Sequence, residues 1–168
     1  MSKVYLISEK TLKTESYIND NVDPAFILPA IITSQDIHLQ PLIGTKLYKT
    51  LKEKVVKNEV DGIYKELLDS YIQPFLVNAV MSDIQLPLAY KIRNAGIVQT
   101  NNEYVNNNYL SDAEKLAAFY MNKMNFYGIR LSNFLHANSS KIPEYNEVND
   151  CSDMAADSMA FNTGIYLG

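Results

Sequence analysis

Apolar residues recur at three- and four-residue spacings over residues 61–85, and this is the clearest periodic pattern in the chain. Such spacings place apolar side chains on one face of an α-helix. Asp61 stands at the start of the pattern and is suited to cap it. Pro74 lies in the middle, where it removes one backbone hydrogen bond and clashes with the carbonyl of Ser70. We therefore predict one long helix over 61–85 that is kinked at Pro74.

A second apolar pattern covers residues 111–137 and alternates spacings of four and three residues. Ser111 and Glu114 form a capping-box pattern at its start. The pattern predicts a second long helix, whose apolar seam packs against the 61–85 helix. The seam consists of Ala113, Ala117, Tyr120, Met124, Tyr127, Leu131 and Phe134.

Local signals predict shorter helices at residues 24–40, 46–57 and 86–93. Asp23 and the proline that follows it mark the beginning of the first. A proline at its second position opens the third helix, and a glycine closes it. The asparagine-rich segment that follows has no helical period, and we expect only a short strand there, at residues 97–98. These elements predict an all-α fold, a small helical bundle.

The periodic pattern disappears after residue 138, and the charge changes at the same place. Residues 1–138 carry 14 Lys/Arg and 14 Asp/Glu, whereas residues 139–168 carry one lysine and five acids, so the net charge of -4 belongs to the last 30 residues. We predict a helical bundle domain over 1–138 and an acidic, irregular C-terminal arm over 139–168 that orders only against a partner. The candidate partner-binding anchors of the arm are Phe161, Ile165, Tyr166 and Leu167.

Composition narrows the function classes. The longest apolar run has eight residues and contains Pro29, which is too short to span a membrane. A neutral body with an acidic arm argues against broad electrostatic capture of nucleic acid. Cys151 is the only cysteine, so neither an intrachain disulfide nor a cysteine-based zinc site can form.

The run Gly44-Thr45-Lys46 invites comparison with a phosphate-binding loop. Such a loop needs a second glycine five residues before the lysine, and the order of residues here does not fit. Gly44 instead suits the left-handed position after a helix, and Thr45 suits the cap of the next one. We predict that Gly44, like Pro74, is a structural hinge without a nucleotide.

No motif for catalysis or metal binding stands out. His38 and His136 are 98 residues apart, and neither has a second ligand at metal-binding spacing. The acids of residues 150–157 lack the glycine and the closing glutamate of a calcium loop. Neither histidine lies beside a serine in a strand-turn-helix elbow, and the acidic surroundings of Cys151 disfavour its thiolate. We therefore expect no catalytic residue, metal or cofactor.

Lys115, Lys123 and Arg130 form a line along the predicted 111–137 helix, at separations of eight and seven residues. Such a line is usually the solvated face of an amphipathic helix. The functional alternative is a surface that lines a DNA channel and touches the phosphate backbone without reading sequence.

Four stretches together resemble a known family. They are "SQDIHLQPLIGTKLYKTL", "YKELLDSYIQPFLVNAV", "YKIRNAGIV" and the closing "TGIYLG", and the pattern LxPxxGxxLYxxL around Gly44 is the most distinctive. Over about residues 20–168 the chain is similar to head-tail connector (adaptor) proteins of tailed bacteriophages, particularly of the crAss-like phages and others that infect Bacteroidetes.

The resemblance implies a virion structural protein that is made in the host cytoplasm and located at the capsid-tail junction. Copies of the chain would form a ring, twelve in related necks, beneath the portal protein. The ring would extend the DNA channel, with non-specific contact to DNA in transit, and would dock further neck or tail proteins. The family has no catalytic residues. The alternative is a helical interaction or regulatory module, monomeric or dimeric, that acts through the seam over 113–134.

Overall fold

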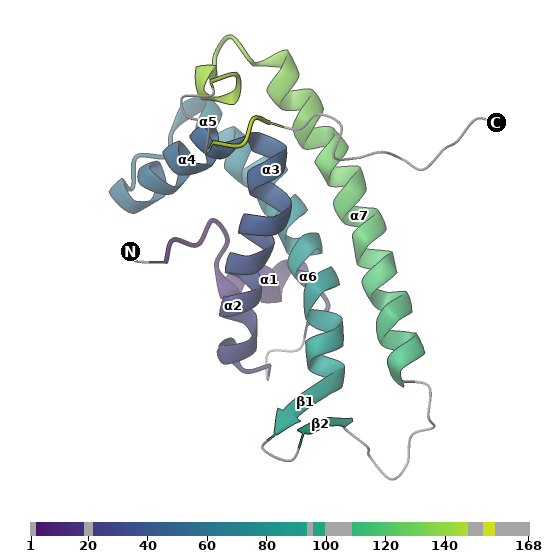
Figure 1. The fold of residues 1–168 in the computed structure, drawn as a ribbon. Helices are drawn as coiled ribbons and strands as arrows, with labels where there is room; N and C mark the ends of the chain where they lie inside the picture. Colours follow the sequence, from purple (N-terminus) through teal and green to yellow (C-terminus); the bar gives the residue numbers. More distant parts are fainter. Residues whose placement is uncertain (1–2, 19–21, 94–95, 100–108, 148–152, 157–168) are drawn as a thin grey trace, which may run out of the picture.

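The computed structural model describes residues 3–18, 22–93, 96–99, 109–147 and 153–156, and the fold is a small all-α bundle with one short β-hairpin (Figure 1). The predicted fold class is therefore confirmed. The elements in chain order are α1 (Glu9–Glu15), α2 (Pro24–Ser34), the π-helix η1 (Gln35–Leu39), α3 (Gln40–Ile43), α4 (Thr45–Lys57), α5 (Gly62–Leu67), the π-helix η2 (Leu68–Ile72), α6 (Gln73–Ala89), β1 (Tyr90–Arg93), β2 (Gly96–Gln99), α7 (Tyr109–Ala137) and the 3-10 helix η3 (Pro143–Tyr145).

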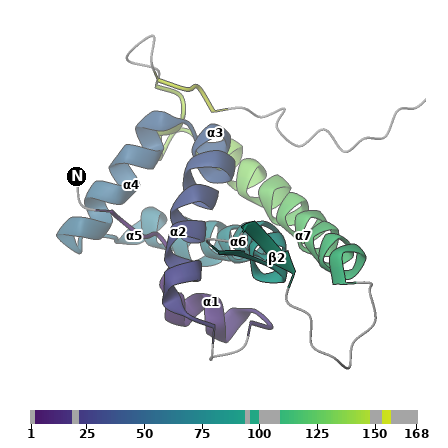
Figure 2. The ribbon, with the colours of Figure 1, turned by 60° about the horizontal axis from the view of Figure 1, so that its bottom comes forward.

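Helix α6 is the centre of the bundle. Helices α2 and α7 both pack against it and lie on its two sides, as the two views of the ribbon show (Figures 1 and 2). Helices α4 and α5 gather with η3 at one end of α6, and the β1–β2 hairpin extends from the other end. Among the described residues, no helix is long and apolar enough to cross a membrane.

The long helix predicted around Pro74 is present but widened. The helical path runs without a break from α5 through η2 into α6, and the Gln73 N–H donates to the Leu68 carbonyl five residues back. Pro74, which has no N–H to donate, follows directly. The discontinuity predicted at this proline thus takes the form of a π turn, and the helix continues to Ala89.

A second π turn precedes a proline in the helical path that begins at Pro24. Helices α2, η1 and α3 form one continuous path, in which the Gln40 N–H donates to the Gln35 carbonyl and Pro41 follows. Asp23 caps the beginning of α2, because its carboxylate accepts from the Ala25 N–H at 2.9 Å. The helix predicted over 24–40 is confirmed, with three more residues at its end.

Two local predictions were wrong. Residues 86–93 do not form a separate helix, because α6 passes through Pro87 and the chain then extends into β1. Strand β1 pairs with β2 in antiparallel register, and β2 contains the strand expected at 97–98. The helix prediction used only local signals, which do not detect the hydrogen bonds that a partner strand supplies. Ser111 is not a cap either, since α7 already begins at Tyr109.

The predicted seam of α7 does pack against α6. Tyr120, Met124 and Leu131 are buried, and Phe134 stacks on Tyr71 with 4.2 Å between the ring centroids. Side chains of α6 and η2 form the opposite side of this contact. Burying each large apolar side chain contributes roughly 1.5–3 kcal/mol, so this contact accounts for much of the stability. The largest buried residues on that side are Ile72, Phe75 and Leu76.

The core extends past the boundary predicted at residue 138. Ile142 and Tyr145 are buried in it, on the irregular segment that contains η3. The Tyr64 hydroxyl donates to Glu144 at 2.8 Å, and burial together with this bond raises the pKa of Tyr64 to about 12. The first residues of the predicted arm therefore belong to the bundle.

Candidate interaction surfaces

Helix α7 carries a second periodic face besides its core seam. Leu116, Phe119, Lys123, Phe126 and Arg130 recur at spacings of three and four residues, and we call these five residues the α7 stripe. Phe119 is 48% exposed and Phe126 is 59% exposed. Exposed aromatic groups of this size on one face are typical of an interaction site rather than of ordinary surface.

The cations of the α7 stripe rest on its aromatic rings. The Lys123 ammonium is 4.4 Å from the centroid of the Phe119 ring, and the Arg130 guanidinium carbon is 6.0 Å from that of Phe126. Such contacts hold a cation over an apolar surface and favour acidic or aromatic partners. Lys115, the remaining member of the predicted basic line, is exposed, and its ammonium lies 3.6 Å from the Asp112 carboxylate.

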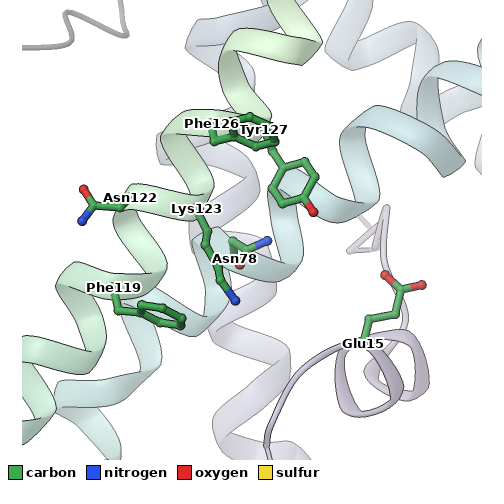
Figure 3. A pocket seen from close by; sticks show the side chains of 7 residues that line it. All are labelled: Glu15, Asn78, Phe119, Asn122, Lys123, Phe126 and Tyr127. Carbon is green, nitrogen blue, oxygen red and sulfur yellow. The ribbon is translucent and has the colours of Figure 1, made fainter.

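A hollow of about 410 Å³ adjoins the stripe between α1, α6 and α7 (Figure 3). Aromatic rings and the Lys123 side chain line it on the α7 side, and an acid from α1 lies across from them. The lining combines aromatic rings with one ammonium and one carboxylate, so the hollow offers both apolar and charged contacts. Its lining consists of Glu15, Asn78, Phe119, Asn122, Lys123, Phe126 and Tyr127.

The turn at Gly44 and Thr45 holds part of the predicted arm. The Thr45 N–H donates to the Met154 carbonyl at 2.9 Å, and the Met154 N–H donates to the Thr45 hydroxyl at 2.9 Å. Lys49 and Asp153 form an ion pair of 3.0 Å beside these bonds. We call this contact the arm anchor. The expectation that Thr45 caps α4 was wrong, because its side chain is engaged by the arm.

Gly44 is buried in this turn with φ +81° and ψ 153°, a conformation open almost only to glycine. A Cβ at this position would lie 3.1 Å from the backbone nitrogen of Ala156. Gly44 lies between α3 and α4 with a positive φ, as the sequence led us to expect, but its ψ lies outside the left-handed helical region that was predicted. The closeness of the arm gives it a second function, since only a residue without a side chain lets the arm approach.

His38 belongs to a polar cluster that joins η1 and α6. Its Nε2 is 3.1 Å from both carboxylate oxygens of Asp83, and the Ser34 hydroxyl donates to the same carboxylate at 2.6 Å. Because an ionised carboxylate only accepts, the histidine nitrogen is the donor. The serine donates to the acid and not to the histidine, so the three residues do not form a catalytic triad.

His136 lies apart from this cluster, with its Nε2 3.4 Å from the Tyr145 hydroxyl. Across the part of the chain that the structure describes, no three metal-ligating side chains come together. The residues predicted as partner-binding anchors lie outside the described residues, as does Cys151. They are Phe161, Ile165, Tyr166 and Leu167.

The Asp83 cluster predicts a pH dependence. Burial tends to raise the pKa of Asp83, but the bonds from His38 and Ser34 outweigh it and lower the pKa below the ordinary 3.8. The unfolded chain therefore takes up the proton first, so this stabilisation is present above about pH 4 and is lost as the pH falls further. We expect Asp83→Asn to lower the free energy of unfolding by about 1–3 kcal/mol at pH 7.

Urea titrations of both proteins at pH 7 and pH 3 measure this difference. The difference in free energy of unfolding between wild type and Asp83→Asn should be smaller at pH 3. At that pH the Asp83 carboxylate of the unfolded wild-type chain is largely protonated, so its ionised form stabilises the fold less. A gap of unchanged size at pH 3 would show that the charge of Asp83 contributes nothing.

Sequence reasoning found the cations of the α7 stripe and missed its aromatic residues. The apolar period of the helix follows its core seam, and a single exposed apolar residue is ordinary on a protein surface. The signal that identifies them is a second three-and-four spacing on the same helix, offset from the first.

Comparison with known proteins gives one family. No curated protein and no solved structure matches the chain. Residues 39–154, well over half of the chain, match the family described as "Family of unknown function (DUF6712)". The matched region begins just before the Gly44 turn, spans α6 and α7, and includes Asp153 and Met154 of the arm anchor. The chain therefore belongs to the DUF6712 family.

Proposed function

We propose that this chain is a head-tail connector subunit of a tailed bacteriophage, which assembles as a ring beneath the portal protein. The observation that carries the proposal is the α7 stripe, an aromatic and basic face on which Leu116, Phe119 and Phe126 remain 43–59% exposed. A subunit of a ring needs such a face, because its neighbours bury it. The resemblance in the sequence around Gly44 supports the same conclusion.

In this function the ring extends the DNA channel and receives further neck or tail proteins. The arm anchor supports this, since Lys49 and Thr45 hold residues 153–156 against the bundle. We propose that Phe161 and Tyr166, which follow in the sequence, dock on a neighbouring protein.

Imaging of the purified chain mixed with its portal protein tests the proposal. Negative-stain images should show a ring of many copies, twelve in number, attached to the portal. Mass measurements that find only monomers or dimers in the presence of portal would favour the helical interaction module instead. For that module the 113–134 seam is a poor surface, because α6 already covers its middle residues. Strong, salt-dependent binding of the isolated chain to DNA would favour a nucleic-acid binder.

Deleting residues 150–168 is expected to prevent ring assembly on the portal while leaving the bundle folded. The deletion removes both the arm anchor and the apolar residues beyond it. Loss of the Thr45 and Lys49 bonds should lower the free energy of unfolding by about 1–2 kcal/mol. Urea denaturation and electron microscopy measure the two effects separately.

A shorter deletion, of residues 157–168, is the matched control. It keeps the anchor, so stability should remain within about 0.5 kcal/mol of the intact chain, while assembly is still impaired. Normal particle assembly by either truncated chain would contradict a docking function of the arm.

A further inference from the structure

Helix α2 and η1 carry an exposed stripe of their own. Phe26, Ala30, Thr33 and Ile37 follow one another at spacings of four, three and four residues, and we call them the α2 stripe. Phe26 is 47% exposed, Ile37 is 60% exposed and Thr33 is also exposed, while Ala30 is partly buried against the edge of the core. Ile27 and Ile31 of the same helix are buried. The stripe is therefore a lateral face, separate from the face that packs on α6.

The two stripes carry complementary charge. Residues 14–45 contain no lysine or arginine, and the exposed acids Asp23 and Asp36 lie just before and just after α2. Residues 115–137 contain no aspartate or glutamate, and their cations include Lys123 and Arg130 of the α7 stripe. A surface that pairs these two regions brings opposite charges together. Pairing either stripe with its own copy would bring like charges together instead.

The stripes also match in length. Residues 26–37 of the α2 stripe and 119–130 of the α7 stripe each span eleven helical steps, about 16 Å at 1.5 Å per residue. Both show the spacing of four, three and four that lets the side-chain ridges of one helix pack into the grooves of another.

A single copy cannot join its two stripes. Helices α2 and α7 lie on the two sides of α6, with α6 between them (Figures 1 and 2). A contact that covers both stripes therefore uses two copies, each of which contributes a different face. Repetition of such a contact closes into a ring when the rotation between copies permits it.

We infer that the α7 stripe of one copy packs against the α2 stripe of the next copy, head to tail. The partner is thus a second copy of this chain. The inference deepens the proposed function, on which it depends only for the closure of the ring.

Cysteine cross-linking of the full-length chain tests the contact. In a Cys151→Ser background, Thr33→Cys places a thiol on the α2 stripe and Asn122→Cys places one beside the α7 stripe, both at exposed positions. A short bismaleimide should convert the double variant into a ladder of multimers. Each single variant should stay monomeric, and a mixture of the two should stop at dimers. Val56→Cys paired with Asn122→Cys is the control, because Val56 is exposed on α4 and should give no ladder.

Charge reversal gives an independent readout. Lys123→Glu combined with Arg130→Glu should weaken self-association at least about tenfold in sedimentation velocity. The same change of charge at Lys57 and Lys65, exposed lysines of α4 and α5, should leave it unchanged. Circular dichroism melting of each variant verifies that the bundle is folded.

Four results would overturn the inference. The first is cross-linked dimers of the Asn122→Cys variant alone, which indicate a symmetric contact between two α7 helices. The second is the absence of a ladder up to about 1 mM protein. The third is a ladder of equal strength with Val56→Cys. The fourth is a pair of results. A peptide of residues 157–168 protects Asn122→Cys from alkylation, and Thr33→Cys does not change the cross-linking. This pair would make the arm the occupant of the α7 stripe.

The test separates the inference from the proposed function. A ring on the portal without α2–α7 cross-links would overturn the inference and leave the function standing. A ladder from a chain that never associates with the portal would do the opposite.

Discussion

Replacing Gly44 by alanine is expected to lower the free energy of unfolding by about 2–4 kcal/mol. Part of the loss is backbone strain, because φ +81° with ψ 153° is costly for any residue with a Cβ. The rest comes from the new Cβ, which would lie 3.1 Å from the Ala156 nitrogen and push residues 153–156 away from Thr45. Urea denaturation measures the loss. Gly44→Val should cost more, since a branched side chain is larger and fits a positive φ less well.

Gly62→Ala is the matched control for this prediction. Gly62 also has a positive φ, +49°, but a Cβ there would meet nothing within 4 Å. Its loss should be about 1 kcal/mol, from backbone strain alone. Equal losses at Gly44 and Gly62 would show that the contact with Ala156 is unimportant. The Gly44 variants should not change nucleotide binding, because we expect none; saturable ATP binding that disappears in Gly44→Val would contradict our interpretation of this turn.

Replacing Gln35 by alanine is expected to cost about 2–4 kcal/mol and to release the N-terminal segment. The Gln35 side chain is fully buried in the π turn of η1, where its Oε1 accepts from the Leu6 N–H at 2.7 Å and its Nε2 donates to the Val4 carbonyl at 3.1 Å. Without it, a buried N–H and a carbonyl lose their partners, and Leu6 and Ile7 lose their fixed place in the core. Urea denaturation gives the free energy, and hydrogen exchange of the Leu6 amide reports the local release.

Gln40→Ala provides the comparison. It removes a side chain of the same size from the other end of the π turn, but that side chain is only half-buried and makes one bond of 3.0 Å, to the Thr45 hydroxyl. We expect a loss of about 1 kcal/mol and no faster exchange at Leu6. Continued protection of the Leu6 amide in Gln35→Ala would mean that the N-terminal segment is held by packing alone.

Sequence periodicity predicted those parts of the fold whose contacts repeat along one helix. The core seam from Tyr120 to Phe134 and the cap at Asp23 follow from spacing and from local hydrogen-bonding chemistry. The β1–β2 hairpin was mostly missed because its stability comes from a partner strand. The π turns were missed because an extra residue in a turn leaves no local signature except the proline that follows it.

The candidate surfaces were predictable to a different degree. Lys123 and Arg130 are separated by two helical turns and were found by spacing. The arm anchor could not be found, because Thr45 and Met154 are 109 residues apart and meet only through the tertiary fold. A contact between residues so far apart in the sequence is determined by tertiary packing and not by local conformational preference.

The π turn before Pro41 changes the direction in which the side chains after it point. One additional residue in a turn rotates all that follows by about 100° relative to an unbroken α-helix. The part before it, α2, packs on α6, whereas the part after it, α3, contacts α4 and α7. A single rod of about twenty residues therefore acts as two differently oriented surfaces without a loop between them. The angle between the Gly44 turn and the centre of the bundle is thus fixed by helix geometry, and residues 153–156 are held on a rigid support.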